Sequence, residues 1–158
     1  MSAAPKHPSE SATEMVQVVL PNDANPMGFM LGGAVMHLID IAAAIAAFRH
    51  ARALMVTAAV DGLEFLNPIK VGDFIVLKSR VTATFKTSLE VEVLVFSEEA
   101  LTGRRQLTSR AYLIFVTLTR DGRREEIPQL IVSTDDEKQL AADALVRREQ
   151  HLARRARI

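Results

Sequence analysis

One segment of the chain constrains its fold more than any other: residues 34–50 are helix formers and are apolar on nearly every side. The segment holds six alanines between Ala34 and Ala47, and it contains no Pro or Gly. A helix that is apolar all round is buried rather than laid on a surface. We therefore expect the rest of the chain to enclose this helix, with the small alanine side chains allowing neighbouring backbones to come close.

The segments around this helix have the composition of strands. One short β-type run precedes the helix and about four follow it in succession, and residues 90–93 alternate strictly between acidic and apolar side chains. The expected strands lie within 16–20, 55–60, 73–83, 90–93 and 107–119, with a strand end before a turn at 65–68, and helical composition resumes over 135–156. A single apolar helix followed by an antiparallel meander has one economical packing, in which the sheet wraps the helix. We predict an α+β hotdog fold with an additional C-terminal helix.

The chain length of 158 residues is that of one domain. A start rich in Ser, Pro and Ala indicates a flexible N-terminal arm over 1–13. The hotdog domain then covers 14–132, and a C-terminal helical extension covers 133–158. A sheet wrapped around one helix leaves a sheet edge and a helix flank uncovered, so we expect a dimer.

Charge and composition exclude several functions. The chain has 19 Lys and Arg against 19 Asp and Glu, which argues against a protein that coats nucleic acid. The absence of cysteine excludes a disulfide scaffold, a thiolate metal site and a Cys nucleophile. We expect no metal site, because the four histidines are scattered at His7, His37, His50 and His151. The N-terminus lacks an apolar signal segment and polar residues interrupt the longest apolar run, which indicates a cytoplasmic protein without a membrane span.

Asp40 is the most informative single residue. It lies in the middle of the apolar helix, where an unpaired carboxylate is costly, and His37 shares its face. The structural interpretation is that Asp40 pairs with another group or faces a water-filled gap. The functional interpretation is a general base or nucleophile whose carboxylate is tuned by burial. We favour the functional interpretation.

Gly32 and Gly33 begin the same helix, about two turns before Asp40. The amides of a first helical turn are unpaired, and glycine lets a substrate carbonyl approach them, which is the geometry of an oxyanion hole. A simple turn from loop to helix explains the same glycines. Asn25, in the preceding loop rich in Pro and Gly, is by itself typical of a turn former.

Taken together, these motifs resemble those of the cytosolic acyl-coenzyme A thioester hydrolases of the hotdog superfamily. The resemblance runs from about Val16 to Pro128 and is most specific between Asn25 and Asp40, where several separate spacings agree. The motifs are Asp23-Ala24-Asn25, Gly28, Gly32-Gly33, Asp40, the alanine run 42–47 and Arg49-His50-Ala51.

The resemblance implies a role for each matching residue. Asp40 would be the catalytic carboxylate, which either activates water or attacks the thioester directly. Asn25 would lie in the facing half of the site and orient water or substrate, and an amide at Gly32 or Gly33 would polarise the thioester carbonyl. In this family the site lies between two subunits, so Asn25 and Asp40 of one site would come from different chains, and three such dimers would form a homohexamer.

The resemblance also names the substrate, an acyl-CoA, with no cofactor required. Lys86, Thr87 and Ser88 match a stretch that lies near the nucleotide part of coenzyme A. Two positions depart from the pattern: His37 stands where similar sequences often have a small polar residue, and Ile41 where many have Glu. Beyond the resemblance, the arginines of the last helix, Arg147, Arg148, Arg154, Arg155 and Arg157, are typical of a solvated helix end.

Two other functions are compatible with the same fold. The first is a non-catalytic hotdog module that binds acyl-CoA. The second is a hotdog enoyl-CoA hydratase or dehydratase, in which His37 and Asp40 would have to supply the pairing of a His with an acid.

Overall fold

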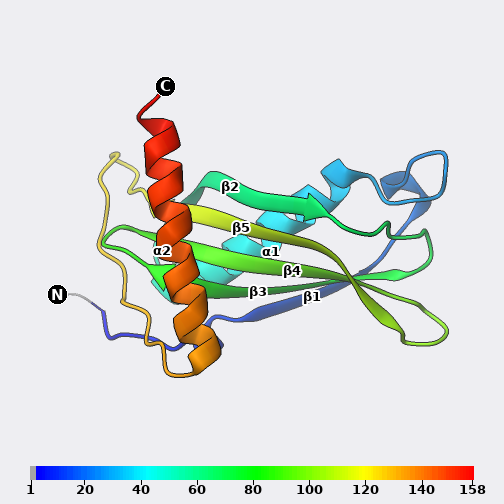
Figure 1. Ribbon diagram of the computed structural model, residues 1–158, viewed down its shortest axis with the longest axis horizontal. Helices are drawn as coiled ribbons and strands as arrows, with labels where there is room; N and C mark the ends of the chain where they lie inside the picture. The colour runs from blue at the N-terminus through cyan, green and yellow to red at the C-terminus, as the bar shows by residue number, and fades with distance from the viewer. Residues whose placement is uncertain (1–2) are drawn as a thin grey trace.

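The computed structural model describes residues 3–158 and shows a five-stranded antiparallel sheet curved around one long helix (Figure 1). The strand order is β1-β3-β4-β5-β2. The strands are β1 Thr13–Val18, β2 Met55–Phe65, β3 Phe74–Thr84, β4 Ser88–Glu98 and β5 Arg105–Thr117. The helices are α1 Gly32–Ala51 and α2 Asp135–Arg155, with short 3-10 turns η1 Pro8–Glu10 and η2 Pro21–Asp23. This arrangement confirms the predicted hotdog fold and its C-terminal helix.

The first strand begins and ends earlier than its composition suggests. β1 pairs with β3 from Thr13 opposite Ser79 to Val18 opposite Phe74, whereas the apolar run predicts a strand over 16–20. The partner strand sets these ends, and a partner strand is not encoded in local composition.

Alanines on α1 allow the sheet to close tightly over the helix. Ala42, Ala43, Ala46 and Ala47 are fully buried against the inner face of the sheet, whose own apolar residues are also buried. The Ser79 hydroxyl donates a 2.8 Å hydrogen bond to the backbone carbonyl of Ala42, which shows how closely strand and helix approach. A larger side chain at these alanines would overpack the core at a cost of about 1–3 kcal/mol.

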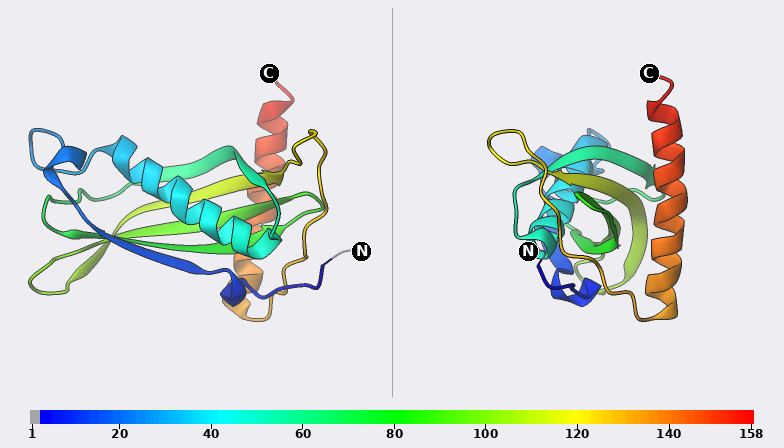
Figure 2. Two further views of the ribbon diagram at one scale, coloured as in Figure 1. Left: turned by 180° about the vertical axis from the view of Figure 1, so that it is seen from behind. Right: turned by 90° about the vertical axis from the view of Figure 1, so that its left-hand side faces the viewer.

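Helix α1 is not enclosed on every side, which corrects the expectation from its composition. The sheet covers one side of the helix and leaves the other side open (Figure 2, left). The exposed residues of α1 include Met36, His37, Asp40, Phe48 and Arg49. By length and composition α1 could cross a membrane, but it is the central helix of this fold and packs on the sheet. An apolar helix with an open face fits a chain that leaves part of its core for a partner to cover.

Strand β2 is an edge strand beside this open face. It pairs only with β5, and the register shifts after Thr57 and again after Asp61. Several of its apolar side chains are exposed, among them Val56, Val60 and Phe65. The unpaired edge and the open side of α1 together form the flank that the sequence predicts for a second copy.

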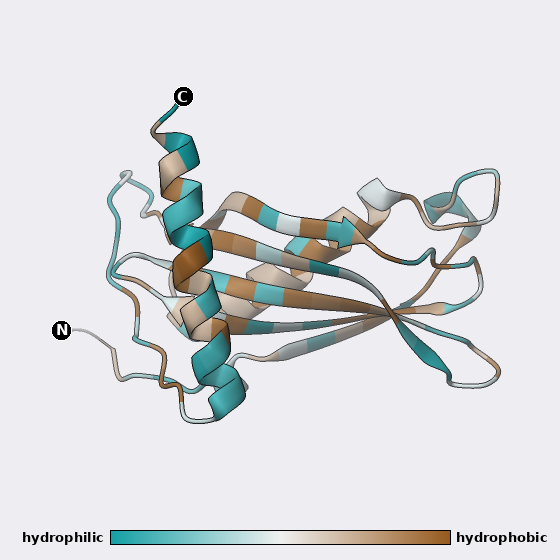
Figure 3. Cartoon of the chain, in the orientation of Figure 1, coloured by the Kyte–Doolittle hydropathy of each residue, from teal (hydrophilic) through white to brown (hydrophobic). Residues whose placement is uncertain are grey.

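Helix α2 crosses the outer face of the sheet, on the side away from α1, and is largely hydrophilic (Figures 1 and 3). Ion pairs hold it: Arg147 contacts Glu90 of β4 at 2.8 Å, Arg154 contacts Asp61 of β2 at 2.8 Å, and Asp136 contacts Arg80 of β3 at 3.0 Å. The interpretation of a solvated basic helix end is therefore wrong for Arg147, whose side chain is only 20% exposed, whereas the Arg154 side chain stays 64% exposed beside its partner. Their partners are acids on strands distant in sequence.

The N-terminal residues run alongside the rest of the fold. The Lys6 amide donates to the Gln129 carbonyl at 3.0 Å, and the Lys6 ammonium donates to the His50 carbonyl at 2.9 Å at the end of α1. Pro8 is buried. Residues 6–12 therefore contact the body of the molecule, although their composition is that of a mobile arm. The division of the chain at 13 and 132 stays a prediction.

Candidate active site

A groove between α1 and the edge strand β2 contains Asp40. Its volume is about 330 Å³, and we refer to it as the Asp40 groove. Helix α1 lines it with residues on one face, β2 lines it from across, and β5 forms part of the floor. The lining residues are Gly33, Met36, His37, Ile39, Asp40, Thr57, Val60, Leu63 and Leu113. The predicted placement of Gly33 and Asp40 on one side of the helix is thus what the structure shows.

The Asp40 carboxylate is held by a neighbour on β2. The Thr57 hydroxyl donates a 2.7 Å hydrogen bond to Oδ1 of Asp40, and Oδ2 has no hydrogen-bond partner among residues 3–158. Asp40 is exposed in the single chain, so the burial expected for this carboxylate is not seen there. One oxygen is therefore oriented while the other remains free to accept a proton.

Thr57 lines the Asp40 groove, although no local motif in the sequence points to it. It lies 17 residues beyond Asp40 on a strand, and threonine is a common strand residue. Only the packing of β2 along α1 brings its hydroxyl to the carboxylate.

The two glycines at the start of α1 face different hollows. The N-cap residue Leu31 provides no side-chain hydrogen bond, so no side chain caps the amides of the first turn. Gly33 lines the Asp40 groove, and a Cβ added there would meet no atom within 4 Å. Gly32 lines a second pocket, where an added Cβ would lie 3.4 Å from the Phe65 ring.

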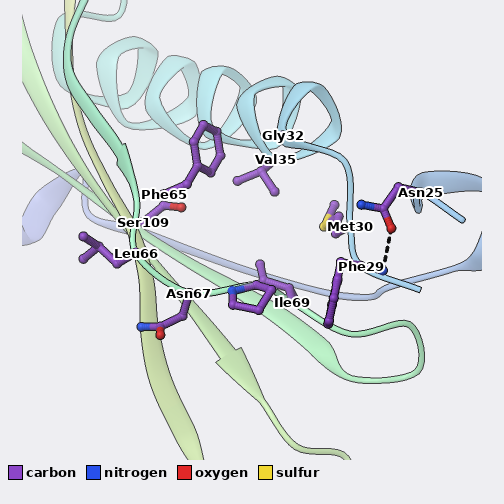
Figure 4. A pocket seen from close by; sticks show the side chains of 11 residues that line it. Asn25, Phe29, Met30, Gly32, Val35, Phe65, Leu66, Asn67, Ile69 and Ser109 are labelled. Atoms are coloured by element: carbon purple, nitrogen blue, oxygen red, sulfur yellow. Dashed lines mark hydrogen bonds between the residues drawn. The ribbon is translucent and has the colours of Figure 1, made fainter. Parts of the chain in front are cut away.

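The side-chain amide of Asn25 uses its oxygen to hold the loop, whereas its nitrogen has no hydrogen-bond partner among residues 3–158. Its Oδ1 accepts hydrogen bonds from the backbone amides of Met27 at 3.0 Å and Phe29 at 3.1 Å, which shapes the loop. Its Nδ2 makes no hydrogen bond with residues 3–158 and points toward Met30 in Figure 4. Asn25 is therefore a turn former through its side-chain oxygen, as predicted. Its side-chain nitrogen stays available to donate a hydrogen bond.

The second pocket, which we call the Asn25 pocket, has a volume of about 350 Å³ and a mainly apolar lining (Figure 4). Its lining residues are Asn25, Phe29, Met30, Gly32, Val35, Phe65, Leu66, Asn67, Pro68, Ile69 and Ser109. Asp40 is not among them. Within one chain, the structure therefore does not bring Asn25 and Asp40 to the same pocket.

Lys86, Thr87 and Ser88 lie at the turn between β3 and β4, outside both hollows. The Lys86 side chain is 79% exposed and lies 3.7 Å from the Glu126 carboxylate. Ser88 is buried, and its hydroxyl accepts a 3.4 Å hydrogen bond from Arg148. Their proposed contact with the nucleotide stays a prediction. Among residues 3–158, no group of three or more His, Asp or Glu side chains is placed to hold a metal ion.

The fold and the groove define the class of protein. The sheet wraps around one helix, which carries an acid and begins with uncapped amides, and residues 27–103 match the thioesterase superfamily. A solved structure of an apo-hexameric acyl-CoA thioesterase superimposes with a TM-score of 0.92 at 37% identity, covering 98% of this chain and 99% of that one.

Two curated relatives narrow the class to a family. The chain is 37% identical over 138 residues to the uncharacterized acyl-CoA thioester hydrolase YkhA of Bacillus subtilis, covering 87% of this chain and 80% of that protein. It is 35% identical over 140 residues to the human cytosolic acyl coenzyme A thioester hydrolase, covering 87% of this chain. The chain spans only 37% of the length of the human protein. The chain belongs to the acyl-CoA thioester hydrolase family.

Structures of an acyl-CoA hydrolase from Staphylococcus aureus bear on the site. One, at 36% identity and a TM-score of 0.89 over 96% of this chain and 93% of that one, is in complex with butyryl coenzyme A and coenzyme A. Three others are variants in which a single Asn, Asp or Thr is replaced by Ala. Those three residues are spaced 15 and 17 residues apart, as are Asn25, Asp40 and Thr57 here.

Proposed function

We propose that the protein hydrolyses the thioester of an acyl-CoA to free coenzyme A and a carboxylic acid. The observation that carries this proposal is the Asp40 carboxylate, oriented by Thr57 and placed in one groove with the uncapped start of α1 at Gly33. Family membership supports it, as do the matching spacings of the three residues varied in the Staphylococcus aureus enzyme.

The groove supplies a base, the Asp40 carboxylate, and a hydrogen-bond donor for the substrate carbonyl, the Gly33 amide. A water molecule attacks the thioester carbonyl and gives its proton to the free oxygen of Asp40, while the Gly33 amide stabilises the negative charge on the carbonyl oxygen. The carbon–sulfur bond then breaks, and the electron pair leaves with sulfur. Direct attack by Asp40 on the carbonyl, followed by hydrolysis of the resulting anhydride, is the second route that this geometry supports.

We propose that the active unit is a dimer in which Asn25 and Asp40 of one site come from different chains. Two features support this: the two residues line separate hollows in one chain, and the β2 edge and the open face of α1 are uncovered. A second copy on this flank would also bury exposed apolar residues such as Met36 and Val60. Hexameric relatives support assembly of three such dimers into a hexamer.

Two further assignments belong to this proposal. The exposed ammonium of Lys86, with Thr87 and Ser88 beside it, would contact the nucleotide part of coenzyme A. The protein would act in the cytoplasm, like the relatives that are named cytosolic.

Release of free thiol from purified protein and acyl-CoA, with no added metal, tests the activity. Asp40→Asn keeps an oxygen that accepts the Thr57 hydrogen bond but removes the base, so we expect loss of turnover with an unchanged unfolding temperature. Full turnover in this variant would refute the role of Asp40. Loss of enoyl-CoA without thiol release would identify a hydratase, and binding without turnover would identify a binding module. A panel from acetyl- to palmitoyl-CoA gives the preferred chain length.

A further inference from the structure

We propose that His37 is a second catalytic residue, which protonates the sulfur atom as it leaves. This inference rests on the proposed thioesterase function and extends it to a second ionisable residue of the same groove. His37 lines the Asp40 groove, and it is the only ionisable side chain of that lining besides Asp40. The other side chains around them are Thr57 and apolar residues.

Helix geometry places His37 between the Gly33 amide and the Asp40 carboxylate, the two groups that the proposed reaction uses. Gly33 precedes His37 by four residues and Asp40 follows it by three, so all three occupy one face of α1. The three residues therefore move as one unit. Whichever chain of a dimer supplies Asp40 to a site also supplies His37.

The structure offers no structural role for the His37 side chain. It is exposed, and it forms no hydrogen bond or ion pair with residues 3–158. The buried His50 ring, in contrast, is bound through Nε2 to the Pro128 carbonyl at 2.8 Å. His151 on α2 lies 3.9 Å from Asp61. Replacing His37 is therefore not expected to disturb the fold of the single chain.

As Asp40 takes a proton from water, its negative charge passes to the substrate oxygen and then to the departing sulfur, where a cationic donor offsets it. Imidazole side chains are partly protonated near neutral pH. Water oxygen bonds to the carbonyl carbon and its proton passes to Asp40. The carbon–sulfur bond breaks with its electron pair on sulfur, and the sulfur takes a proton from the His37 imidazolium. The proton on Asp40 then returns to the His37 imidazole through solvent, which leaves acid and thiol as the only products.

Proton donation to a leaving group matters less as that group becomes a weaker base. The test therefore compares His37→Gln with the native protein on three thioesters of one acyl group: the CoA ester, a simple alkyl thioester and an aryl thioester, whose thiol is far more acidic. His151→Gln serves as the matched control, because it removes a histidine outside the groove. Unfolding temperatures check that both variants are folded.

We expect His37→Gln to lower kcat on the CoA and alkyl thioesters by about tenfold to a hundredfold, within the range of general acid catalysis. The deficit should shrink severalfold on the aryl thioester, and the control should match the native protein throughout. A deficit of the same size on all three esters, or no deficit, would overturn the role of His37. If the native protein and the control release no thiol from any ester, the thioesterase proposal itself fails, and the role of His37 fails with it.

Discussion

The Thr57 hydroxyl on β2 donates a 2.7 Å hydrogen bond to Oδ1 of Asp40 on α1, across 17 residues of sequence. This contact connects the edge strand to the central helix at the carboxylate that we propose takes part in the reaction. It selects one side-chain orientation of Asp40 and leaves the second carboxylate oxygen free.

Loss of this hydrogen bond should reduce catalysis. Hydrogen bonds to charged groups contribute about 1.5–3 kcal/mol, so Thr57→Val should lower kcat/KM for acyl-CoA by about tenfold or more. Thr57→Ser keeps the hydroxyl and should retain most of the activity. Steady-state thiol release measures both variants. Equal rates of thiol release in Thr57→Val and Thr57→Ser would show that the hydroxyl does not act on Asp40.

Substitutions can distinguish the roles of the side-chain oxygen and nitrogen of Asn25. Asn25→Asp keeps the Oδ1 that accepts from Met27 and Phe29 but removes the Nδ2 donor. We expect a lower kcat with little change in unfolding temperature. Asn25→Ala removes both groups and should lower both quantities. An effect confined to KM in the Asp variant would make Asn25 a binding residue rather than one that assists the chemical step.

The ion pair under α2 should contribute strongly to stability. Glu90 has a side chain only 2% exposed, and Arg147 bonds both of its oxygens at 2.8 and 3.0 Å. Arg147→Met leaves a buried carboxylate without its cation, which costs about 3–5 kcal/mol in the free energy of unfolding. The pair of changes Glu90→Gln and Arg147→Met together should recover much of this loss. Urea denaturation of the single and double variants measures the difference, and a double variant no more stable than Arg147→Met would contradict the prediction.

Stability should fall in mild acid because of His50. Burial lowers the pKa of the His50 imidazole below its ordinary value. Its Nε2 faces the Pro128 carbonyl, and its Nδ1 is buried without a hydrogen-bond partner. In the unfolded chain histidine binds a proton near pH ~6.5, whereas in the folded chain His50 binds it only at lower pH.

This contribution to stability is therefore complete above about pH 6.5 and is lost as the pH falls below it, by at most about 1.4 kcal/mol per pH unit. Urea denaturation at several pH values between 7.5 and 5 measures the trend. The slope should be shallower in His50→Asn, which cannot bind the proton. If stability depended on pH in the same way in the native protein and in His50→Asn, His50 would not be the cause of the loss in acid.

Much of the arrangement on α1 follows from local spacing. The positions of Gly33, His37 and Asp40 on one helix face depend only on helical periodicity, so the sequence predicts them correctly. The open face of α1 is different, because an all-apolar composition does not reveal which side of the helix the sheet covers and which side it leaves open.

The sequence by itself determined the hotdog fold, the central helix and the acid at its middle, because periodicity and composition are local properties. Only the tertiary structure decided that Thr57 orients Asp40, that Asn25 lies in a separate pocket within one chain, and that Arg147 and Arg154 pair with acids on distant strands. The hydrogen bonds and ion pairs join residues 17 to 93 positions apart. Asn25 and Asp40, in contrast, are only 15 positions apart and lie in different pockets. Their geometry depends on how strands and helices pack, and packing is set by the whole chain rather than by any one segment.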